Sequence, residues 1–417
     1  MGKKVLIVGS GGREHALAWK LARSSDVARV YVAPGNAGTP QWNVPIQAND
    51  ISGLVRFAKE EEIDLTVVGP EEPLSLGIVD SFTEQGLRVF GPTKAAAQLE
   101  SSKAFAKMIM DEAKVPTASW EVFEEAALAK EYVRKIGVPC VLKADGLAAG
   151  KGVIVAMDLD TALDAVDEIF DGAFGDAGKK LIIEEYLEGQ EVSLLCFCDG
   201  KTAYPMTPVQ DHKRALDNDQ GLNTGGMGTY SPPPVWTTEV EDLVMKEIVD
   251  PTLRIMREKG IPFTGVLFVG LMLTNTGPKV LEYNARFGDP ETQVIMIRLE
   301  SDLFSILWAC TERKLDTVAV EWSNEKAVCV VMAAPGYPAS YKKGIPINVP
   351  SLAQNEVVFH AGTTVQNDRL VSSGGRVLGV TAMAPDLVEA RQKAYEIVKR
   401  ISFPEAHFRT DIGLKGL

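Results

Sequence analysis

The chain has 417 residues, a formal net charge of −13 at neutral pH and the apolar content of an ordinary globular protein. This length allows roughly three domains, and the acidic balance argues against nucleic acid as a general partner. No apolar run approaches the ~20 residues that span a membrane, and five scattered cysteines do not form a disulfide framework. We therefore expect a cytoplasmic protein with small-molecule substrates and no nucleic-acid or membrane partner.

The first hundred residues alternate buried strands with amphipathic helices, which predicts a parallel sheet with helices on both faces. The strand at 4–8 runs into a glycine turn, Gly9 to Arg13, whose backbone N–H groups face an anion at the start of a helix. The second strand ends in Pro34-Gly35-Asn36 without an acid, which excludes NAD binding. A phosphate-binding turn and a tight turn that binds nothing both remain. Glu71, after the strand at 65–68, is either a helix-start charge or a substrate contact.

A second unit of strands and helices extends from residue 117 to residue 188. Its strand at 139–143 ends in Lys143, a charge that is costly beside apolar residues unless it meets an anion. The loop that follows is rich in glycine and alanine and carries Lys151, and small residues let the backbone approach a phosphate closely. The spacing of a Walker A loop is absent. A flexible hairpin is the alternative to a phosphate-binding loop.

An acidic connection follows the next predicted strand, at 180–185. The backbone of Glu185 to Leu187 offers partners for an adenine, and the Glu191 carboxylate offers an acceptor for ribose hydroxyls. An acidic hinge between domains is the alternative. From Pro205 to Val235 we expect one long polar loop, and loops of this length are usually functional. His212 in this loop has no Cys or His partner at the spacing of a metal site.

A helix is predicted over 237–259, and a β-hairpin follows it. The apolar run 263–273, a turn at Gly277-Pro278 and a strand at 279–283 form this hairpin. Residues two apart on a strand face one side, so Glu282 and Asn284 point together, and Arg286 continues the spacing. Carboxylate and amide oxygens suit magnesium, whereas a solvated edge strand is the alternative.

Asp289-Pro290 is predicted to form the N-cap and first position of a helix. From about residue 325 short strands and a last helix, 386–400, predict a small α/β cap. We find no dense cluster of candidate chemistry in this cap.

Together these motifs resemble the glycinamide ribonucleotide synthetase family of the ATP-grasp superfamily, over essentially the whole chain. The stretch Arg286 to Gln293 and the loop Gly225 to Gly228 are particular to that family. The resemblance implies an α/β ATP-grasp fold with an N-terminal parallel-sheet domain and a small C-terminal α/β domain. The implied boundaries are an N-terminal domain of 1–100, a central domain of 101–116 and 189–324, a mobile lid of 117–188 and a C-terminal domain of 325–417.

The resemblance also implies a reaction, an early step of de novo purine biosynthesis. ATP, glycine and 5-phosphoribosylamine would give ADP, phosphate and glycinamide ribonucleotide through a glycyl phosphate. Such a phosphoryl transfer depends on positioning and charge neutralisation and needs no protein nucleophile. The protein would be a monomer.

By position, the resemblance implies three groups of site residues. ATP would be bound by Lys103, Lys143, Gly150, Lys151, Gly152, Glu184, Glu185, Tyr186, Leu187, Glu191 and Lys213. The other substrates would be bound by Gly11, Gly12, Arg13, Asp211, Gly225, Gly226, Met227, Gly228, Arg286 and Asp289. Magnesium or manganese would be bound by Glu282 and Asn284. Arg286 and Lys143 would have catalytic roles. Many ATP-grasp enzymes carry a further metal carboxylate on the preceding strand, but the run 263–273 contains no acid.

Two other functions remain compatible with the sequence. One is another ATP-grasp enzyme, such as a carboxylase that uses bicarbonate as its acid. The other is a nucleotide-binding regulator without activity, against which the presence of both Glu282 and Asn284 argues.

Overall fold

The computed structural model describes residues 2–147, 152–353 and 355–417. Its first unit is the predicted parallel sheet, and the strands lie in the order β2-β1-β3-β4. Apolar side chains of β1 are fully buried between helices, which explains why this strand reads as a continuous apolar run. The elements are β1 (Lys3–Gly9), α1 (Gly12–Leu21), β2 (Val27–Pro34), α2 (Ile51–Glu60), β3 (Leu65–Val68), α3 (Glu71–Leu76), α4 (Ile78–Glu84) and β4 (Val89–Phe90).

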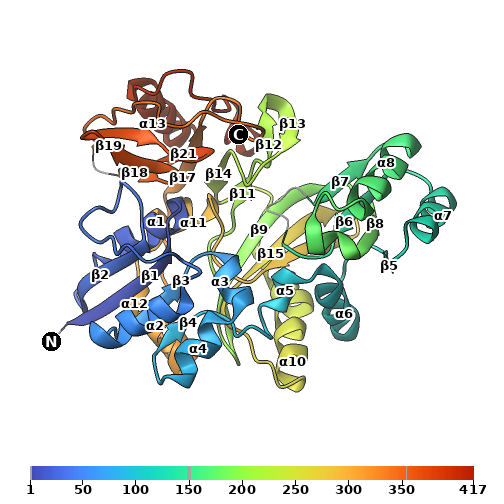
Figure 1. Ribbon diagram of the computed structural model, residues 1–417, viewed down its shortest axis with the longest axis horizontal. Coiled ribbons are helices and arrows are strands. Elements are labelled where there is room, and N and C mark those ends of the chain that lie inside the picture. The colour runs from blue at the N-terminus through green and yellow to red at the C-terminus, as the bar shows by residue number, and fades with distance from the viewer. Residues whose placement is uncertain (1, 148–151, 354) are drawn as a thin grey trace.

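The central unit is an antiparallel sheet in the order β10-β9-β15-β16, with helices packed against it (Figure 1). The predicted hairpin is confirmed as β15 and β16, but its turn lies at residues 275–276, and Gly277 and Pro278 already belong to β16. Ser102 caps α6 by accepting a hydrogen bond from the N–H of Phe105. The elements are α5 (Gln98–Ser101), α6 (Lys103–Ala113), β9 (Gln190–Asp199), β10 (Ala203–Pro205), β15 (Thr264–Thr274), β16 (Gly277–Asn284), α11 (Glu291–Arg298) and α12 (Leu303–Glu312).

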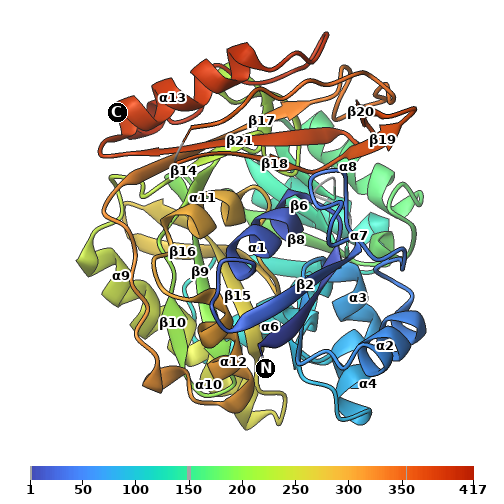
Figure 2. The same cartoon turned by 90° about the vertical axis from the view of Figure 1, so that its left-hand side faces the viewer.

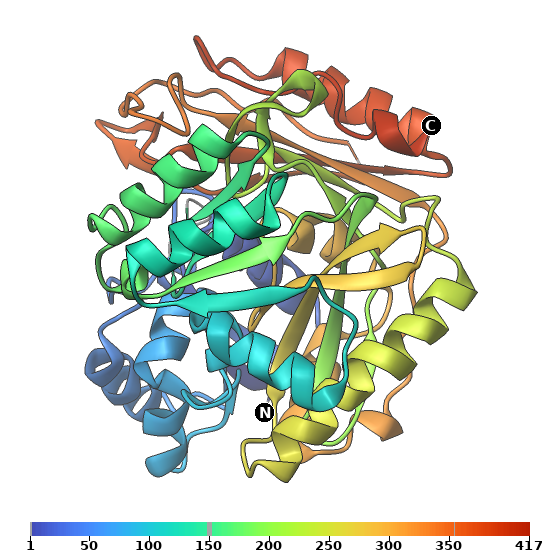
Figure 3. The ribbon, with the colours of Figure 1, turned by 90° about the vertical axis from the view of Figure 1, so that its right-hand side faces the viewer.

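The helix expected over 237–259 is continuous but contains a π-helical segment (Figure 3). It consists of α9 (Thr238–Val244), the π-helical segment Met245–Val249 and α10 (Asp250–Glu258). Pro251, which has no backbone N–H to donate, is the second residue after the π-helical segment. The wider turn therefore lies where the regular hydrogen-bond ladder loses a donor.

The unit at 117–188 is an antiparallel sheet in the order β5-β8-β6-β7, and its two helices lie on the outer face (Figure 3). Small and branched apolar residues of α7 and α8 pack on that sheet in one core of their own. The elements are β5 (Trp120–Phe123), α7 (Ala126–Ile136), β6 (Cys140–Ala144), β7 (Val153–Ala156), α8 (Leu159–Phe170) and β8 (Leu181–Glu185).

The C-terminal unit is a sheet in the order β11-β14-β17-β21-β18, and α13 lies across one face of it (Figure 2). The expectation of one long loop at 205–235 is wrong, because four short strands lie within that segment. Two of them, β11 and β14, join the C-terminal sheet, and β12 pairs with β13 as a small hairpin. The elements are β11 (Gln210–Asp211), β12 (Arg214–Leu216), β13 (Gln220–Asn223), β14 (Gly228–Ser231), β17 (Lys326–Ala333), β18 (Glu356–His360), β19 (Thr363–Gln366), β20 (Arg369–Ser372), β21 (Arg376–Ala384) and α13 (Leu387–Arg400).

Among the described helices, none is long and apolar enough to cross a membrane.

The C-terminal sheet contacts the N-terminal unit through a pair of histidines. The backbone N–H of His360 donates to Nδ1 of His15 at 2.8 Å, and the His15 ring packs edge-on against Phe359. Asn36 donates to the carbonyls of Ser10 and His360, both at 2.8 Å. Burial and the neighbouring His360 lower the pKa of His15 to about 3, and burial lowers that of His360 to about 4. Both rings are therefore neutral when the two units are joined.

We expect this contact to make the protein sensitive to acid. An unfolded histidine takes up a proton near pH 6.5, whereas the folded His15 resists until about pH 3. The stability is therefore complete above pH 6.5 and declines as the pH falls below it, by about 1 kcal/mol or more at pH 5. His15→Gln keeps an acceptor for the His360 N–H but cannot titrate. Urea denaturation at pH 7 and pH 5 should show a smaller loss for this variant, and equal losses would contradict the assignment.

Candidate active site

A cavity of about 1100 Å³ lies where the four units meet. Its walls include Arg13 from the N-terminal unit, Lys143 from the unit at 117–188, Glu282 from the central sheet and Arg376 from the C-terminal sheet. It is also lined by most of the residues predicted from the sequence to bind ATP or metal. These are Lys103, Lys143, Gly152, Glu184, Glu185, Tyr186, Leu187, Glu191, Lys213, Glu282 and Asn284.

One wall of the cavity carries a buried cluster of two lysines and a carboxylate. Glu184 on β8 lies between Lys143 on β6, at 2.8 Å, and Lys107 on α6, at 3.0 Å. Lys143 also donates to the carbonyl of Leu281 at 3.0 Å, which ties the unit at 117–188 to β16. Burial lowers the pKa of Lys107 to about 8, although Glu184 opposes this shift. The Glu184 carboxylate thus faces lysines, and Lys107 is a member of the cluster that the sequence did not single out.

The loop after β6 is described only at its two ends. Gly150 and Lys151, which the sequence predicts at the ATP phosphates, lie outside the described residues. Lys103 reaches the near end of this loop and donates to the carbonyl of Gly146 at 2.9 Å. Gly152 at the far end accepts from the N–H of Ala144 at 2.9 Å.

A second cationic centre, Lys213, lies among carboxylates. Its Nζ is 3.3 Å from Asp211, and Glu191, Glu282 and Glu291 also face it. Although burial opposes it, these acids raise the pKa of Lys213 above its ordinary value, so the ammonium is fully charged. Burial and Asp211 raise the pKa of Glu291 to about 7. Glu291, the first residue of α11, was not singled out from the sequence and lines the same cavity.

Glu282 and Asn284 lie on the same face of β16, as the alternation of the strand predicts. Although burial opposes ionisation, Lys213, Lys143 and Lys103 lower the pKa of Glu282, so its carboxylate is an anion. Within the described ranges, no three His, Cys, Asp or Glu side chains are close enough to hold a metal among themselves. The carboxylate of Glu282 and the amide of Asn284 carry oxygen atoms of the kind that magnesium takes beside substrate phosphates.

Arg286, two residues beyond Asn284, is held by acids. Its guanidinium is 2.8 Å from Glu100 and 3.3 Å from Glu71, and it donates to Oδ1 of Asn284 at 3.4 Å. Glu100 also accepts from the N–H of Ala285 at 2.7 Å. The sequence left open whether Glu71 is a helix-start charge or a substrate contact. In the structure its carboxylate forms an ion pair with Arg286. Glu100 was not predicted, since nothing in its own helix marks it.

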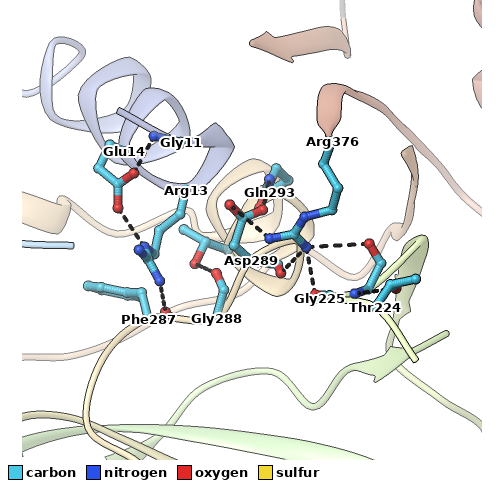
Figure 4. A network of polar contacts seen from close by, with 12 residues as sticks. Gly11, Arg13, Glu14, Thr224, Gly225, Phe287, Gly288, Asp289, Gln293 and Arg376 are labelled. Atoms are coloured by element: carbon cyan, nitrogen blue, oxygen red, sulfur yellow. Dashed lines mark hydrogen bonds and ion pairs between the residues drawn. The ribbon is translucent and has the colours of Figure 1, made fainter. Parts of the chain in front are cut away.

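In the glycine turn before α1, a carboxylate of the protein itself accepts hydrogen bonds from two donors. Glu14 accepts from the N–H of Gly11 at 2.5 Å and from Nε of Arg13 at 2.5 Å. The guanidinium of Arg13 also donates to the carbonyl of Phe287 at 3.0 Å (Figure 4). The phosphate-binding interpretation of this turn thus meets a turn in which Glu14 already accepts from the N–H of Gly11.

Asp289 is not the N-cap of α11, contrary to the prediction. The helix begins at Glu291 and Pro290 is its N-cap, so the Asp289 side chain is free for other contacts. It accepts from Nε2 of Gln293 at 2.9 Å and lies 3.6 Å from Arg376 (Figure 4).

The loop Gly225 to Gly228 lies beside Asp289, and Arg376 of the C-terminal sheet donates hydrogen bonds to both. Thr224 accepts from the N–H of Gly226 at 2.9 Å, and Met227 is fully buried. Arg376 and Tyr337 from the C-terminal sheet unit line the cavity here, together with Lys415. The sequence predicted no dense cluster of candidate chemistry in the C-terminal unit, and the residues of that unit that line the cavity are indeed widely spaced along the chain. No local motif marks these residues, because the fold brings them singly to the cavity.

Comparisons with known proteins agree with this architecture. Family models of phosphoribosylglycinamide synthetase match the chain in three segments, the N domain at 3–100, the ATP-grasp (A) domain at 101–292 and the C domain at 327–415. A phosphoribosylamine–glycine ligase from Brucella melitensis is 52% identical over 99% of this chain and 98% of its own length.

Solved structures extend the comparison to the fold. A phosphoribosylamine–glycine ligase from Thermotoga maritima has a TM-score of 0.86 and 34% identity, and the match covers 98% of this chain and 99% of that chain. The biotin carboxylase domain of the Hydrogenobacter thermophilus 2-oxoglutarate carboxylase, solved with MgADP and bicarbonate, has a TM-score of 0.71 at 17% identity, with 98% and 92% covered. That second likeness concerns the fold alone and agrees with the predicted ATP-grasp architecture. The chain belongs to the phosphoribosylglycinamide synthetase family.

Proposed function

We propose that this protein is an ATP-dependent ligase that joins glycine to 5-phosphoribosylamine. The products are glycinamide ribonucleotide, ADP and phosphate, and the step belongs to de novo purine biosynthesis. The observation that carries this proposal is the match to the family over almost the whole chain, at 52% identity to a curated ligase of that name. The cavity supports it, since lysines, a carboxylate–amide pair and Arg286 all face one space.

The residues present fit a divalent cation bound together with a nucleotide. Glu282 is an ionised carboxylate, and the amide oxygen of Asn284 is on the same strand face. Magnesium commonly takes one or two protein oxygens and completes its shell with phosphates and water. We therefore propose that Glu282 and Asn284 hold magnesium, with manganese as the alternative, and that the ion neutralises charge on the ATP phosphates.

The lysines supply the remaining positive charge for phosphoryl transfer. Lys103, which donates to the carbonyl of Gly146, and Lys143, which donates to that of Leu281, both line the cavity, where they can neutralise phosphate oxygens. Glu185 to Leu187 and Glu191 line the same cavity and suit the adenosine part. We propose that the unit at 117–188 closes over ATP as a lid, moving relative to the central unit at 101–116 and 189–324. Units 1–100 and 325–417 would hold the phosphosugar.

The acid to be activated is the carboxylate of glycine, which is a poor acyl donor because its oxygen does not leave. Transfer of the γ-phosphoryl group gives glycyl phosphate, and the amine of phosphoribosylamine then displaces phosphate. Arg286 lies next to Asn284, where its guanidinium would orient the reacting carboxylate. Asp211 and Asp289 would accept hydrogen bonds from the amine and hydroxyls of the sugar.

The experiment that tests this function is release of phosphate from ATP in the presence of magnesium, glycine and fresh phosphoribosylamine, with each component omitted in turn. The proposal predicts stoichiometric glycinamide ribonucleotide and phosphate only in the complete mixture. Turnover with bicarbonate in place of glycine would instead indicate a carboxylase. ATP binding without phosphate release in any mixture would indicate a regulator.

A further inference from the structure

Arg376, the first residue of β21, connects the C-terminal sheet to two loops of the site. Its guanidinium donates to the carbonyls of Gly225 at 2.6 Å, Gly226 at 3.3 Å and Asp289 at 2.5 Å. The same side chain lies 3.6 Å from the carboxylate of Asp289 (Figure 4). One partly buried guanidinium thus joins the glycine loop to the turn before α11.

The two loops that Arg376 joins are packed so closely that a side chain at Gly225 or Gly226 would collide with its neighbours. A Cβ atom on Gly226 would lie 2.6 Å from Cδ of Pro290, and one on Gly225 would lie 3.0 Å from Cζ of Arg376. Gly226 also has a φ of +111°, which L side chains rarely adopt. The glycines are therefore required for this contact, and Arg376 fills the space that their missing side chains leave.

The Asp289 carboxylate depends on Arg376 for its charge. It is buried against the start of α1, where a Cβ on Gly11 would lie 3.1 Å from its Oδ2. Burial opposes its ionisation, and Arg376 is the main group that lowers its pKa, followed by Arg13. Without Arg376 the carboxylate would lose its nearest positive partner, and its side chain could turn away from the glycine turn.

Gln293 extends the same arrangement to the N-terminal unit. Its Nε2 donates to Asp289 and lies 2.6 Å from the position that a Cβ on Gly12 would take. Its Oε1 is buried and has no hydrogen-bond partner among the described residues. A buried acceptor without a partner is costly. Asp289, which Gln293 holds, lines the cavity, and its carboxylate can accept hydrogen bonds from hydroxyl or amine donors of a ligand.

We propose that Arg376 is a positioning residue for the phosphosugar substrate: it fixes Asp289 and the Gly225–Gly226 segment against the glycine turn, so that the C-terminal sheet completes the sugar site. This inference rests on the proposed function and assigns to the C-terminal unit a part in binding one substrate only. ATP and glycine lie toward Lys143, Glu282 and Arg286 and should not depend on it.

The test compares Arg376→Ala with the unaltered protein for three ligands. Loss of the charged hydrogen bonds should raise the KM for phosphoribosylamine and the Kd for glycinamide ribonucleotide, measured by calorimetry, by roughly 10- to 100-fold. The KM values for ATP and glycine should change by less than about twofold. A rise in all three constants together, or no change in the phosphosugar constants, would overturn the proposal.

Two further variants separate positioning from stability. Arg391→Ala is the matched control, because Arg391 also donates to two backbone carbonyls, Ile412 at 3.0 Å and Thr410 at 2.5 Å, but within the C-terminal unit. It should lower Tm and leave the phosphosugar constants unchanged. Tyr337→Phe removes the partner of the Gly225 N–H, at 3.3 Å, and should raise the same constants by a smaller factor. If Arg376→Ala does not fold, the Tyr337→Phe variant tests the proposal instead. An unchanged KM for phosphoribosylamine and an unchanged Kd for glycinamide ribonucleotide in that variant would refute it.

If the unaltered protein makes no glycinamide ribonucleotide, the proposed function itself fails. If it does, and the Arg376→Ala constants match those of the unaltered protein, only the role of Arg376 fails.

Discussion

Replacing Glu282 with glutamine should reduce metal-dependent turnover by roughly 10²- to 10³-fold while the protein stays folded. The substitution keeps the shape of the side chain on β16 and removes its negative charge. Glu282 faces Lys213, Lys143 and Lys103, which keep its carboxylate ionised although burial opposes this. Without that charge, the cation proposed at Glu282 and Asn284 would lose its one anionic protein ligand.

The measurement is the initial rate of phosphate release as a function of magnesium concentration. Glu282→Gln should require more magnesium and should bind manganese more weakly when the ion is followed by its paramagnetic resonance. Asn284→Asp is the matched variant, since it keeps an oxygen ligand at the neighbouring position and adds a charge. Turnover of Glu282→Gln that equals the unaltered rate at limiting magnesium would remove Glu282 from the metal site.

Replacing Lys143 with methionine should lower kcat/KM for ATP by roughly 10²- to 10³-fold. Methionine keeps the length of the side chain within β6 but offers no charge to a phosphate. Lys143 is almost fully buried and reaches Glu184 at 2.8 Å and the carbonyl of Leu281 at 3.0 Å. The variant therefore also loosens the tie between the unit at 117–188 and β16.

Lys107→Met provides the control for stability, because Lys107 holds the same Glu184 carboxylate at 3.0 Å from the other side. Each variant leaves Glu184 with a single lysine, so the two should lose similar amounts of unfolding free energy. The loss of activity should be larger for Lys143→Met. Equal losses of activity in the two variants would indicate that Lys143 acts only through Glu184.

Local periodicity was sufficient to predict part of the site. A strand alternates its faces every residue, so the spacing of Glu282 and Asn284 alone placed both on one side of β16. Lys143 could be recognised because a charge at the end of an apolar strand needs a partner. The parallel N-terminal sheet followed from the alternation of strand and helix.

The remaining features depend on contacts between residues far apart in the chain. Arg376 meets Gly225 across 151 positions, and Glu100 meets Ala285 across 185, so no local pattern reports either contact. The segment at 205–235 has the sequence pattern of a loop because its strands are only two to four residues long, and β14 pairs with the distant β17. Asp-Pro is a common helix start, which predicts a helix cap at Asp289. In the fold, however, its side chain contacts Arg376 and accepts a hydrogen bond from Gln293.

Glycine labelled with heavy oxygen in its carboxylate tests the central claim most directly. If glycine is activated as glycyl phosphate, one carboxylate oxygen leaves with the phosphate in each turnover. Mass analysis of the released phosphate should therefore find one labelled oxygen per molecule, with exchange of free glycine measured alongside. Unlabelled phosphate released together with labelled glycinamide ribonucleotide would contradict an acyl phosphate and with it the account of this site.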